Sequence, residues 1–413
     1  WEDRTLGLNN AVMGARVAYN FRDIVAVKAL WGMPRFGMKF SDTQVRGADA
    51  SFAISNLAGW QNVYLAVEGS VLDRYEKLSA SMQAEELSPN RLGYSARVNF
   101  DVDGFFFKGE YVGAGKQVMD ALSAAYGRKP DNANAQLVEF GYNGNGLGLT
   151  FTGRRMERMT QKIYAYDSNQ PGYGSAVNML SYRPAMTTQY TYMLMTLNPY
   201  SPEIGDKAQA AGEIGGQVDA FYNFRRGTKI GGKRGMKVHA NFSTWYSLNA
   251  DGGTKGGEFL FRDFSFDVEK QWTKKFKSVL MYSMQDYNHI SMTTGNNVGL
   301  AHVFVADLLY KWTSRLSSRM ELQYLSSKED QKDWMAGLIE VNFAPHWSVF
   351  ASDMWNHGDT GMHYYNAGVS FSMSNIRVAA GYGRYRAGYI CSGGVCRMIP
   401  AYTGANLSLT ASF

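Results

Sequence analysis

The stretch from Glu213 to Trp272 contains three successive segments in which apolar and polar residues alternate with a period of two. The polar positions include charged residues, and the apolar positions carry mainly aliphatic and aromatic side chains. Side chains on a β-strand point alternately to the two faces of a sheet. Each segment therefore predicts a strand with one apolar and one polar face, in a sheet that separates two different environments.

These segments are too long for an ordinary soluble sandwich. Strands in globular proteins average about five to six residues, whereas each alternating segment runs to about ten or more. A tilted strand of about ten residues crosses a bilayer, with its apolar face toward lipid and its polar face toward a lumen. We therefore predict an all-β fold, an antiparallel transmembrane β-barrel that uses residues 1–413 as a single domain.

Similar alternation along the rest of the chain predicts about nineteen strands. The connections between them are alternately short and long, as periplasmic turns and external loops are in outer-membrane barrels. Bacterial barrels generally have even strand numbers, so we expect about 18 to 20 strands, with one further strand preceding or including the first residues. The segment from Met156 to Ala211 lacks clear alternation. We expect it to be either external or inserted into the lumen, with part of it in a short helix.

The last predicted strand places Leu407, Leu409, Ala411 and Phe413 on one face and small polar residues on the other. A terminal phenylalanine on an alternating last strand resembles the signal that the outer-membrane assembly machinery reads in bacterial barrels. We therefore expect these four side chains to face lipid.

The composition agrees with a closed sheet. The chain has 26 Tyr, 23 Phe and 44 Gly but only 9 Pro, and Pro is excluded from sheet interiors because it lacks the ladder donor. The mean hydropathy is negative, and no uninterrupted apolar run approaches about 18 residues, so spanning helices are not expected. The net charge of +6 is mild and its basic residues are interspersed with acidic ones, which excludes a nucleic-acid footprint.

Two cysteines, Cys391 and Cys396, enclose the tetrapeptide Ser-Gly-Gly-Val. A turn can close this spacing into a small disulfide loop in an oxidising compartment. A metal site would need two more ligands nearby, and none stands in the adjacent sequence. We predict a Cys391–Cys396 disulfide. The sequence carries no export signal, so we expect the chain to begin at a processed or truncated end.

Three stretches of the sequence are distinctive. They are the opening from Trp1-Glu-Asp-Arg to Gly-Ala-Arg16, the stretch Val45-Arg-Gly-Ala-Asp49, and a Cys-x4-Cys-Arg motif that precedes the final Ser-Phe413. These stretches resemble an uncharacterised outer-membrane β-barrel family of Bacteroidota. The resemblance covers the whole chain and implies a barrel in the outer membrane. Members have residues before the Trp-Glu-Asp-Arg equivalent, which fits a further strand. The resemblance implies no catalytic residue.

The polar faces of the predicted strands carry many ionisable residues. Those expected to line the lumen are Asp219, Lys237, His239, Asp263, Asp267, Glu269, Arg91 and Arg97. Charged rings select solutes in a water-filled pore. Opposite charges can instead pair across the interior, and their role is then only to maintain the shape of the barrel. Both interpretations stay open, because the sequence does not say which charges meet.

His239 shares a predicted strand with Ser243, and Asp219 and Asp263 lie on the flanking strands. A nucleophile and a base could meet there, but a lumenal polar network accounts for the same residues. We predict a non-enzymatic protein with no catalytic residue, cofactor or metal.

Two functions fit a barrel of this size. The first is a porin-like channel for small polar solutes, narrowed by Met156 to Ala211, since about sixteen strands or more can enclose water. The second is a non-conducting scaffold for outer-membrane lipoproteins or secretion components, and a barrel hydrolase is a third alternative. The expected location is the bacterial outer membrane, in contact with lipid and lipopolysaccharide.

Overall fold

The computed structural model describes residues 12–36, 39–40, 42–77, 87–116, 131–157, 162–164, 174–176, 192–197, 212–248, 257–290, 295–392 and 395–411. In these ranges the helical elements are one α-helical turn, α1 (Ile54–Ala58), and one 3-10 turn, η1 (Leu194–Thr196). No helix in them is long and apolar enough to cross a membrane.

The main sheet consists of long strands of 10 to 15 residues. They are β1 (Val12–Phe21), β2 (Val25–Phe36), β4 (Gln44–Ala53), β5 (Val63–Tyr75), β6 (Asn90–Val102), β7 (Phe105–Ala114), β8 (Ala133–Gly144), β9 (Leu147–Glu157), β12 (Gly212–Phe224), β13 (Met236–Ser247), β14 (Phe259–Gln271), β15 (Phe276–Ile290), β16 (Asn297–Lys311), β17 (Leu316–Ser327), β18 (Trp334–Phe343), β19 (Trp347–Asn356), β20 (His363–Met373), β21 (Ile376–Tyr385) and β24 (Tyr402–Ala411). The short strands are β3 (Lys39–Phe40), which joins this sheet, and the hairpin pairs β10 (Lys162–Tyr164) with β11 (Gly174–Ala176) and β22 (Gly388–Ser392) with β23 (Val395–Ile399).

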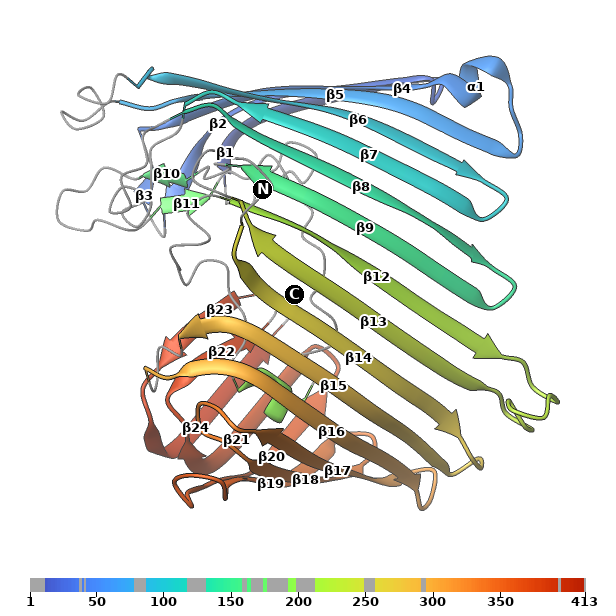
Figure 1. The fold of residues 1–413 in the computed structure, drawn as a ribbon, viewed down its shortest axis with the longest axis vertical. Helices are drawn as coiled ribbons and strands as arrows, with labels where there is room; N and C mark the ends of the chain where they lie inside the picture. Colours follow the sequence, from blue (N-terminus) through green and yellow to red (C-terminus); the bar gives the residue numbers. More distant parts are fainter. Residues whose placement is uncertain are drawn as a thin grey trace.

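Each long strand pairs antiparallel with the long strands before and after it in the chain, from β1 with β2 to β21 with β24. The sheet curves round into an open barrel (Figure 1). The prediction of an all-β antiparallel barrel is confirmed, and the 19 long strands described lie within the predicted number.

The two ends of the barrel differ. At one end, here called the turn end, most connections are short, such as 103–104 and 145–146. Asp103 with Gly104, and Asn145 with Gly146, have positive φ at both turn positions, as two-residue hairpins of type I′ require. The turn end also carries α1 and the longer connection 225–235. The opposite end, the loop end, carries long connections such as 76–89, 158–211 and 386–401.

The predicted alternation is present in the register of the strands. On β6, Leu92 and Tyr94 are exposed on the outer face, whereas Arg91 and Ser95 are buried on the inner face. On β9, Leu149 and Phe151 are exposed, whereas Thr152 is buried. The inner face is therefore the polar one, as the period of two predicts.

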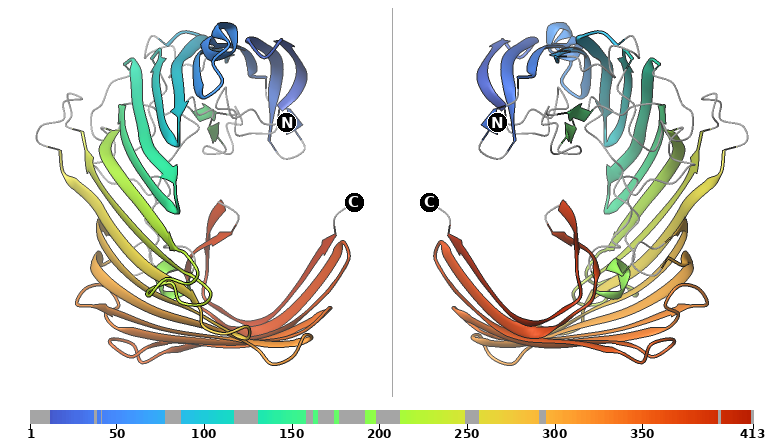
Figure 2. Two further views of the ribbon diagram at one scale, coloured as in Figure 1. Left: turned by 90° about the vertical axis from the view of Figure 1, so that its right-hand side faces the viewer. Right: turned by 90° about the vertical axis from the view of Figure 1, so that its left-hand side faces the viewer.

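The described part of the sheet does not close. β1 pairs with β2 and β24 pairs with β21, but no pairing joins β1 to β24 among the described residues. Figure 2 shows the resulting opening between the N-terminal and C-terminal strands. The predicted further strand lies outside the described residues.

Candidate functional site

The inner wall of β4 to β7 holds a network centred on Arg97. Its Nε donates to Glu68 Oε2 at 2.8 Å, and its Nη2 is paired with Asp49. Ser95 Oγ, also hydrogen-bonded to Arg97, donates to Glu110 Oε1 at 2.8 Å. Arg97 lies directly opposite Glu68 in the strand register. Two carboxylates therefore contact the guanidinium directly and Glu110 is linked to it through Ser95, so the charges pair along the wall from β4 to β7.

A second network lies on β16 and β17 and is centred on Arg319. Its Nε and Nη2 bind both carboxylate oxygens of Asp307, at 3.0 and 2.9 Å, and Nη2 also binds Glu321 at 2.6 Å. Gln323 donates to the other oxygen of Glu321. This fork-shaped contact is the geometry that guanidinium groups favour with carboxylates, and it fixes the positions of both acidic side chains.

The third network is built on His239 of β13. Its Nε2 lies 2.7 Å from Asp219 Oδ2 and its Nδ1 lies 2.8 Å from Asp267 Oδ1. Asn241 donates to the same oxygen of Asp219 at 2.9 Å. The sequence placed Asp263 as the second flanking carboxylate. In the structure Asp267 lies opposite His239, and Asp263 lies opposite Ser243.

This arrangement opposes the catalytic interpretation of His239. A general base needs a ring nitrogen within reach of the nucleophile's proton, and both ring nitrogens face carboxylates. The Ser243 hydroxyl makes no hydrogen bond within the described part of the chain. His239 therefore links three strands, and no nucleophile and base pair is formed with Ser243.

Two residues predicted to line the lumen are buried instead. Arg91 is paired with Glu76, and both side chains are almost wholly covered. Asp263 is fully buried and accepts a hydrogen bond from the Tyr287 hydroxyl at 3.0 Å. These groups hold the wall together and do not face open water.

A further buried pair was not predicted. Arg154 of β9 is paired with Glu213 of β12, and its guanidinium lies 4.6 Å from the ring centroid of Trp245. All three side chains are buried on the inner face. The sequence signal was present, since Trp245 interrupts the polar positions of β13 with a large aromatic side chain.

The remaining predicted residues are more accessible. Glu269 binds Lys277 at 2.8 Å across β14 and β15. Lys237 lies over the ring of Phe221 at 5.4 Å. These groups lie near the turn end of their strands.

The inner wall of β15 to β18 is apolar where the other walls are polar. Its buried residues are Met281, Ala301, Val303, Val305, Leu325, Trp334 and Ala336. The sequence carries a signal of this patch, because Val303-Phe304-Val305 on β16 is apolar on both faces. We predicted polar residues throughout the lumen and missed it.

The segment Tyr192–Leu197, which contains η1, covers this patch. Leu194 and Met195 are fully buried against it, together with Tyr192 and Leu197. Gln323 Oε1 accepts from the Leu194 N–H at 2.9 Å, and Gln285 Nε2 donates to the Met195 carbonyl at 3.3 Å. The described part of the predicted segment Met156 to Ala211 that contains η1 therefore lies against the inner wall of β15 to β18.

A further hydrogen bond holds the segment at Leu197. Arg386, between β21 and β22, donates to the Leu197 carbonyl. Burial and the nearby carboxylates of Asp307 and Glu321 raise the pKa of the Tyr192 hydroxyl, which therefore stays protonated. The segment is thus fixed by apolar packing and by hydrogen bonds from three elements.

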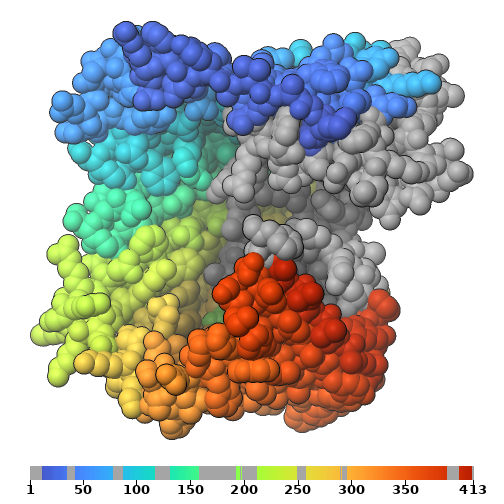
Figure 3. All heavy atoms as spheres, turned by 180° about the vertical axis from the view of Figure 1, so that it is seen from behind, coloured from blue at the N-terminus to red at the C-terminus, as the bar shows by residue number. Residues whose placement is uncertain are grey.

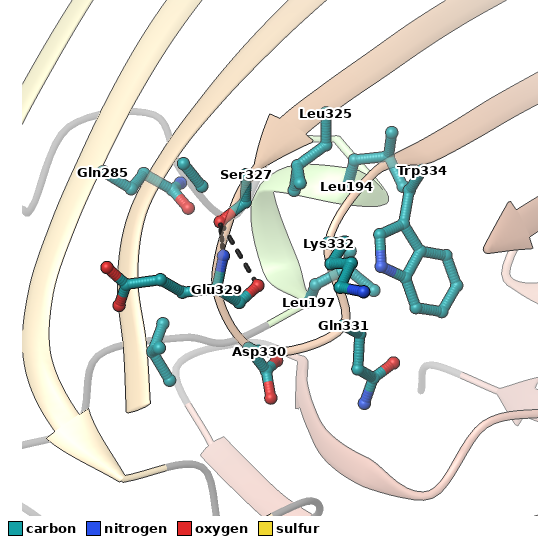
Figure 4. Close-up of a pocket in the computed structure, with 12 residues that line it drawn as sticks. Leu194, Leu197, Gln285, Leu325, Ser327, Glu329, Asp330, Gln331, Lys332 and Trp334 are labelled. Carbon is teal, nitrogen blue, oxygen red and sulfur yellow. Dashed lines mark hydrogen bonds between the residues drawn. The ribbon is translucent and has the colours of Figure 1, made fainter. Parts of the chain in front are cut away.

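A pocket lies between this segment and the connection 328–333 at the loop end (Figure 4). Leu194, Leu197 and Trp334 form its apolar side, and Glu329 and Lys332 line its polar side. Its free volume of about 20 Å³ holds about one water molecule. The segment therefore fits closely against the wall.

The hairpin β22–β23 places Cys391 directly opposite Cys396. Figure 2 shows this hairpin, near the red end of the colour scale, bending away from the wall toward the interior. The side chains of this hairpin are outside the described set, so the disulfide stays a prediction. Within the described ranges, no group of three or more His, Cys, Asp or Glu side chains could hold a metal ion.

The family described as Family of unknown function (DUF6029) matches residues 1–413. No protein with a curated description matches the chain. Among solved structures, the P pilus usher (PapC) translocation pore is 10% identical, with a TM-score of 0.45, over 95% of this chain and 61% of its own length. The chain thus spans less than two thirds of that protein.

Two further solved structures are similar. The copper transporter OprC is 10% identical with a TM-score of 0.42, over 96% of this chain and 71% of its own. The siderophore receptor PirA from Pseudomonas aeruginosa is 13% identical with a TM-score of 0.42, over 98% and 70%. Because these TM-scores lie below 0.5, no property of the three proteins is transferred to this chain.

Proposed function

We propose, for a chain that belongs to the Family of unknown function (DUF6029), that the protein is a bacterial outer-membrane β-barrel that forms a channel for small polar solutes. Its lumen is narrowed by Tyr192–Leu197. The observation that carries the proposal is the division of one curved sheet into an exposed apolar outer face and a polar inner face.

The outer face supports a membrane location. Large apolar side chains are exposed along it from β1 to β24, including Val67, Phe140, Phe266, Phe304 and Ile339. A soluble monomer rarely exposes a contiguous apolar patch larger than a few hundred Å². Contact with lipid removes the free-energy cost of exposing these apolar side chains to water. Strands of 10 to 15 residues are also long enough to cross the hydrocarbon core.

Both borders of the apolar outer face carry the residues expected at a membrane boundary. At the turn end Trp272, Trp312 and Trp347 are exposed, which matches the aromatic girdle of membrane barrels. Ion pairs stand on the outer face near the loop end, namely Arg46 with Asp73, Arg155 with Glu157, and His363 with Asp353. The apolar belt between these borders is the part that we place in lipid.

The asymmetry of the connections supports the outer membrane and gives the orientation. Membrane barrels of bacteria have short periplasmic turns and longer external loops. We therefore place the turn end in the periplasm and the loop end outside the cell. The segment Tyr192–Leu197 enters from the loop end, so it narrows the channel from the external side.

The substitution Leu409→Arg tests the lipid-facing register. Leu409 is exposed on the outer face of β24, and an arginine near the middle of the membrane costs about 2 to 4 kcal/mol. We expect a large loss of folded protein in the outer-membrane fraction, measured by the heat-dependent gel shift of the barrel. Ser408→Arg, on the inner face, is the matched control, and equal losses for both variants would contradict the register.

Conduction is tested with the purified protein in planar lipid bilayers. We expect discrete current steps in potassium chloride, because the inner wall is polar and its charges are held by neighbouring strands. Insertion is measured separately by protease protection in vesicles. If the inserted protein gives no steps, the channel proposal fails, and a non-conducting scaffold for lipoproteins or secretion components takes its place.

A further inference from the structure

The inner wall formed by β19, β20, β21 and β24 differs from the charged walls described above. Side chains alternate between the two faces of a strand, and the register shows which residues of these strands share the inner face. Over these four described strands, one charged side chain stands at an inner position, that of Arg377 at the turn end. The other inner positions carry mainly serine, asparagine, glycine and tyrosine. Figure 3 shows the C-terminal strands, in red, standing apart from the N-terminal strands, in blue.

Four of these inner residues form a connected cluster at the loop end of the wall. Tyr385 and Tyr402 lie opposite each other on β21 and β24, and their rings stack with a centroid distance of 4.5 Å. The Tyr385 hydroxyl donates to Asn366 Oδ1 at 3.0 Å and accepts from Asn406 Nδ2. One hydroxyl therefore fixes two amide side chains, which belong to β20 and β24 on either side of β21.

The cluster leaves polar groups and an aromatic side chain available to a ligand. Within the described part of the chain, Asn366 Nδ2 and Asn406 Oδ1 have no hydrogen-bond partner. Tyr402 is 41% exposed. Gly381 lies opposite Asn406, and a Cβ atom there would come within 3.3 Å of Asn406 Oδ1 and 3.5 Å of Asn366 Oδ1. The absence of a side chain at Gly381 therefore keeps the space between the two amides open.

We propose that Tyr385, Tyr402, Asn366, Asn406 and Gly381 form a binding site for neutral saccharides, here called the tyrosine–asparagine site. A pyranose ring presents C–H groups on its face and hydroxyl groups at its edge. The face packs on the apolar body of a tyrosine ring. An amide offers both a donor and an acceptor, which match neighbouring sugar hydroxyls. Because Tyr385 already holds both amides, binding costs little further side-chain entropy.

The surroundings of the site favour an uncharged solute over an ion. A charged solute loses water when it contacts this wall, and it gains no counter-charge from the inner positions near the cluster. Two arginines at the loop end of β21 are already held, since Arg384 lies over the Tyr364 ring at 5.6 Å and Arg386 donates to the Leu197 carbonyl. The site thus selects against charge.

The site lies next to the narrowing of the lumen. Tyr364, the inner residue before Asn366 on β20, packs against the apolar cluster that Tyr192–Leu197 covers. A solute that enters from the loop end therefore meets the tyrosine–asparagine site beside this segment. The inference rests on the proposed channel function, to which it gives a class of solute, but binding is measured without conduction.

Saturation-transfer NMR on the purified full-length protein tests the binding. The protein is held in lauryldimethylamine oxide, a detergent without sugar groups. The probes are maltose and maltobionate, an anionic disaccharide derivative of similar size. We expect saturation transfer to maltose and none to maltobionate. Absence of transfer to maltose would overturn the site, and equal transfer to both probes would overturn its selectivity for neutral solutes.

Three variants locate the binding. Tyr402→Ala removes the aromatic face and Asn406→Leu removes an amide, and each should weaken maltose binding about five- to tenfold. Gly404→Gln fills the site without removing any of its side chains, since a Cβ atom at Gly404 meets only the Tyr402 ring at 3.9 Å. It should abolish the transfer. The control is Tyr365→Ala, which removes an exposed outward tyrosine beside Asn366 and should bind maltose normally.

The heat-dependent gel shift shows that each variant is folded. Unchanged maltose binding in folded Tyr402→Ala and Gly404→Gln would contradict the proposed site. Current recordings in planar bilayers separate this inference from the channel proposal. Current without saturation transfer to maltose would overturn the site and leave the channel standing. Saturation transfer that the variants abolish, without current, would support the site and end the channel proposal.

Discussion

Replacing Leu194 and Met195 together by aspartate is expected to raise the single-channel conductance severalfold while the barrel still inserts. Both side chains are fully buried against the apolar wall of β15 to β18. A carboxylate buried without a partner is strongly unfavourable, so the segment Tyr192–Leu197 should leave the wall and widen the lumen. The measurement is the current per channel in planar bilayers.

Ile230→Asp is the control for the added negative charge, because Ile230 is exposed in the connection 225–235 at the turn end. It should leave the conductance unchanged. If the double variant inserts normally and conducts as the unsubstituted protein does, then Tyr192–Leu197 does not lie in the path of the ions.

Glu213→Gln is expected to lower the free energy of unfolding by about 3 to 5 kcal/mol, because it removes the negative charge that pairs with the buried guanidinium of Arg154. The Arg154 side chain is buried on the inner wall and stacks on Trp245, so solvent screens this pair only weakly. Denaturant titration of the folded barrel, followed by tryptophan fluorescence, measures the loss.

The matched control is Glu269→Gln, which removes a carboxylate from the more accessible pair with Lys277. Exposed ion pairs contribute about 0 to 1 kcal/mol, so this variant should differ little from the unsubstituted protein. Similar losses for the two variants would mean that burial does not determine how much these ion pairs contribute to the free energy of unfolding.

The strands were predictable because the period of two is a local property. Leu92 and Tyr94 face outward and Arg91 and Ser95 face inward from the alternation alone. The tight turns were equally local, since Asp103-Gly104 needs only two residues with positive φ. The fold class therefore follows from short stretches of sequence.

The partners of the charged residues were not predictable in the same way. Whether His239 meets Asp263 or Asp267 depends on the register of β13 against β14, which contains an irregularity between Trp245 and Tyr246. A shift of the register changes every cross-strand pair, and the long connection 248–258 does not fix it. The sequence therefore predicted which residues share the polar face, but not that His239 meets Asp267.

The position of Tyr192–Leu197 could not be predicted from the pattern within any single strand. The apolar wall that it covers is assembled from inward positions of four strands, and each strand contributes only one to three residues to it. No single strand shows a patch of this size. Only the register of β15 to β18 brings Met281, Val303 and Leu325 together.

The pairing of every long strand with its neighbours in the chain has a consequence for how the protein folds. Each pairing joins segments separated by one connection, so the entropy lost on forming a hairpin is that of closing a single loop. The sheet can therefore grow by one hairpin after another from any starting point, without a long-range search.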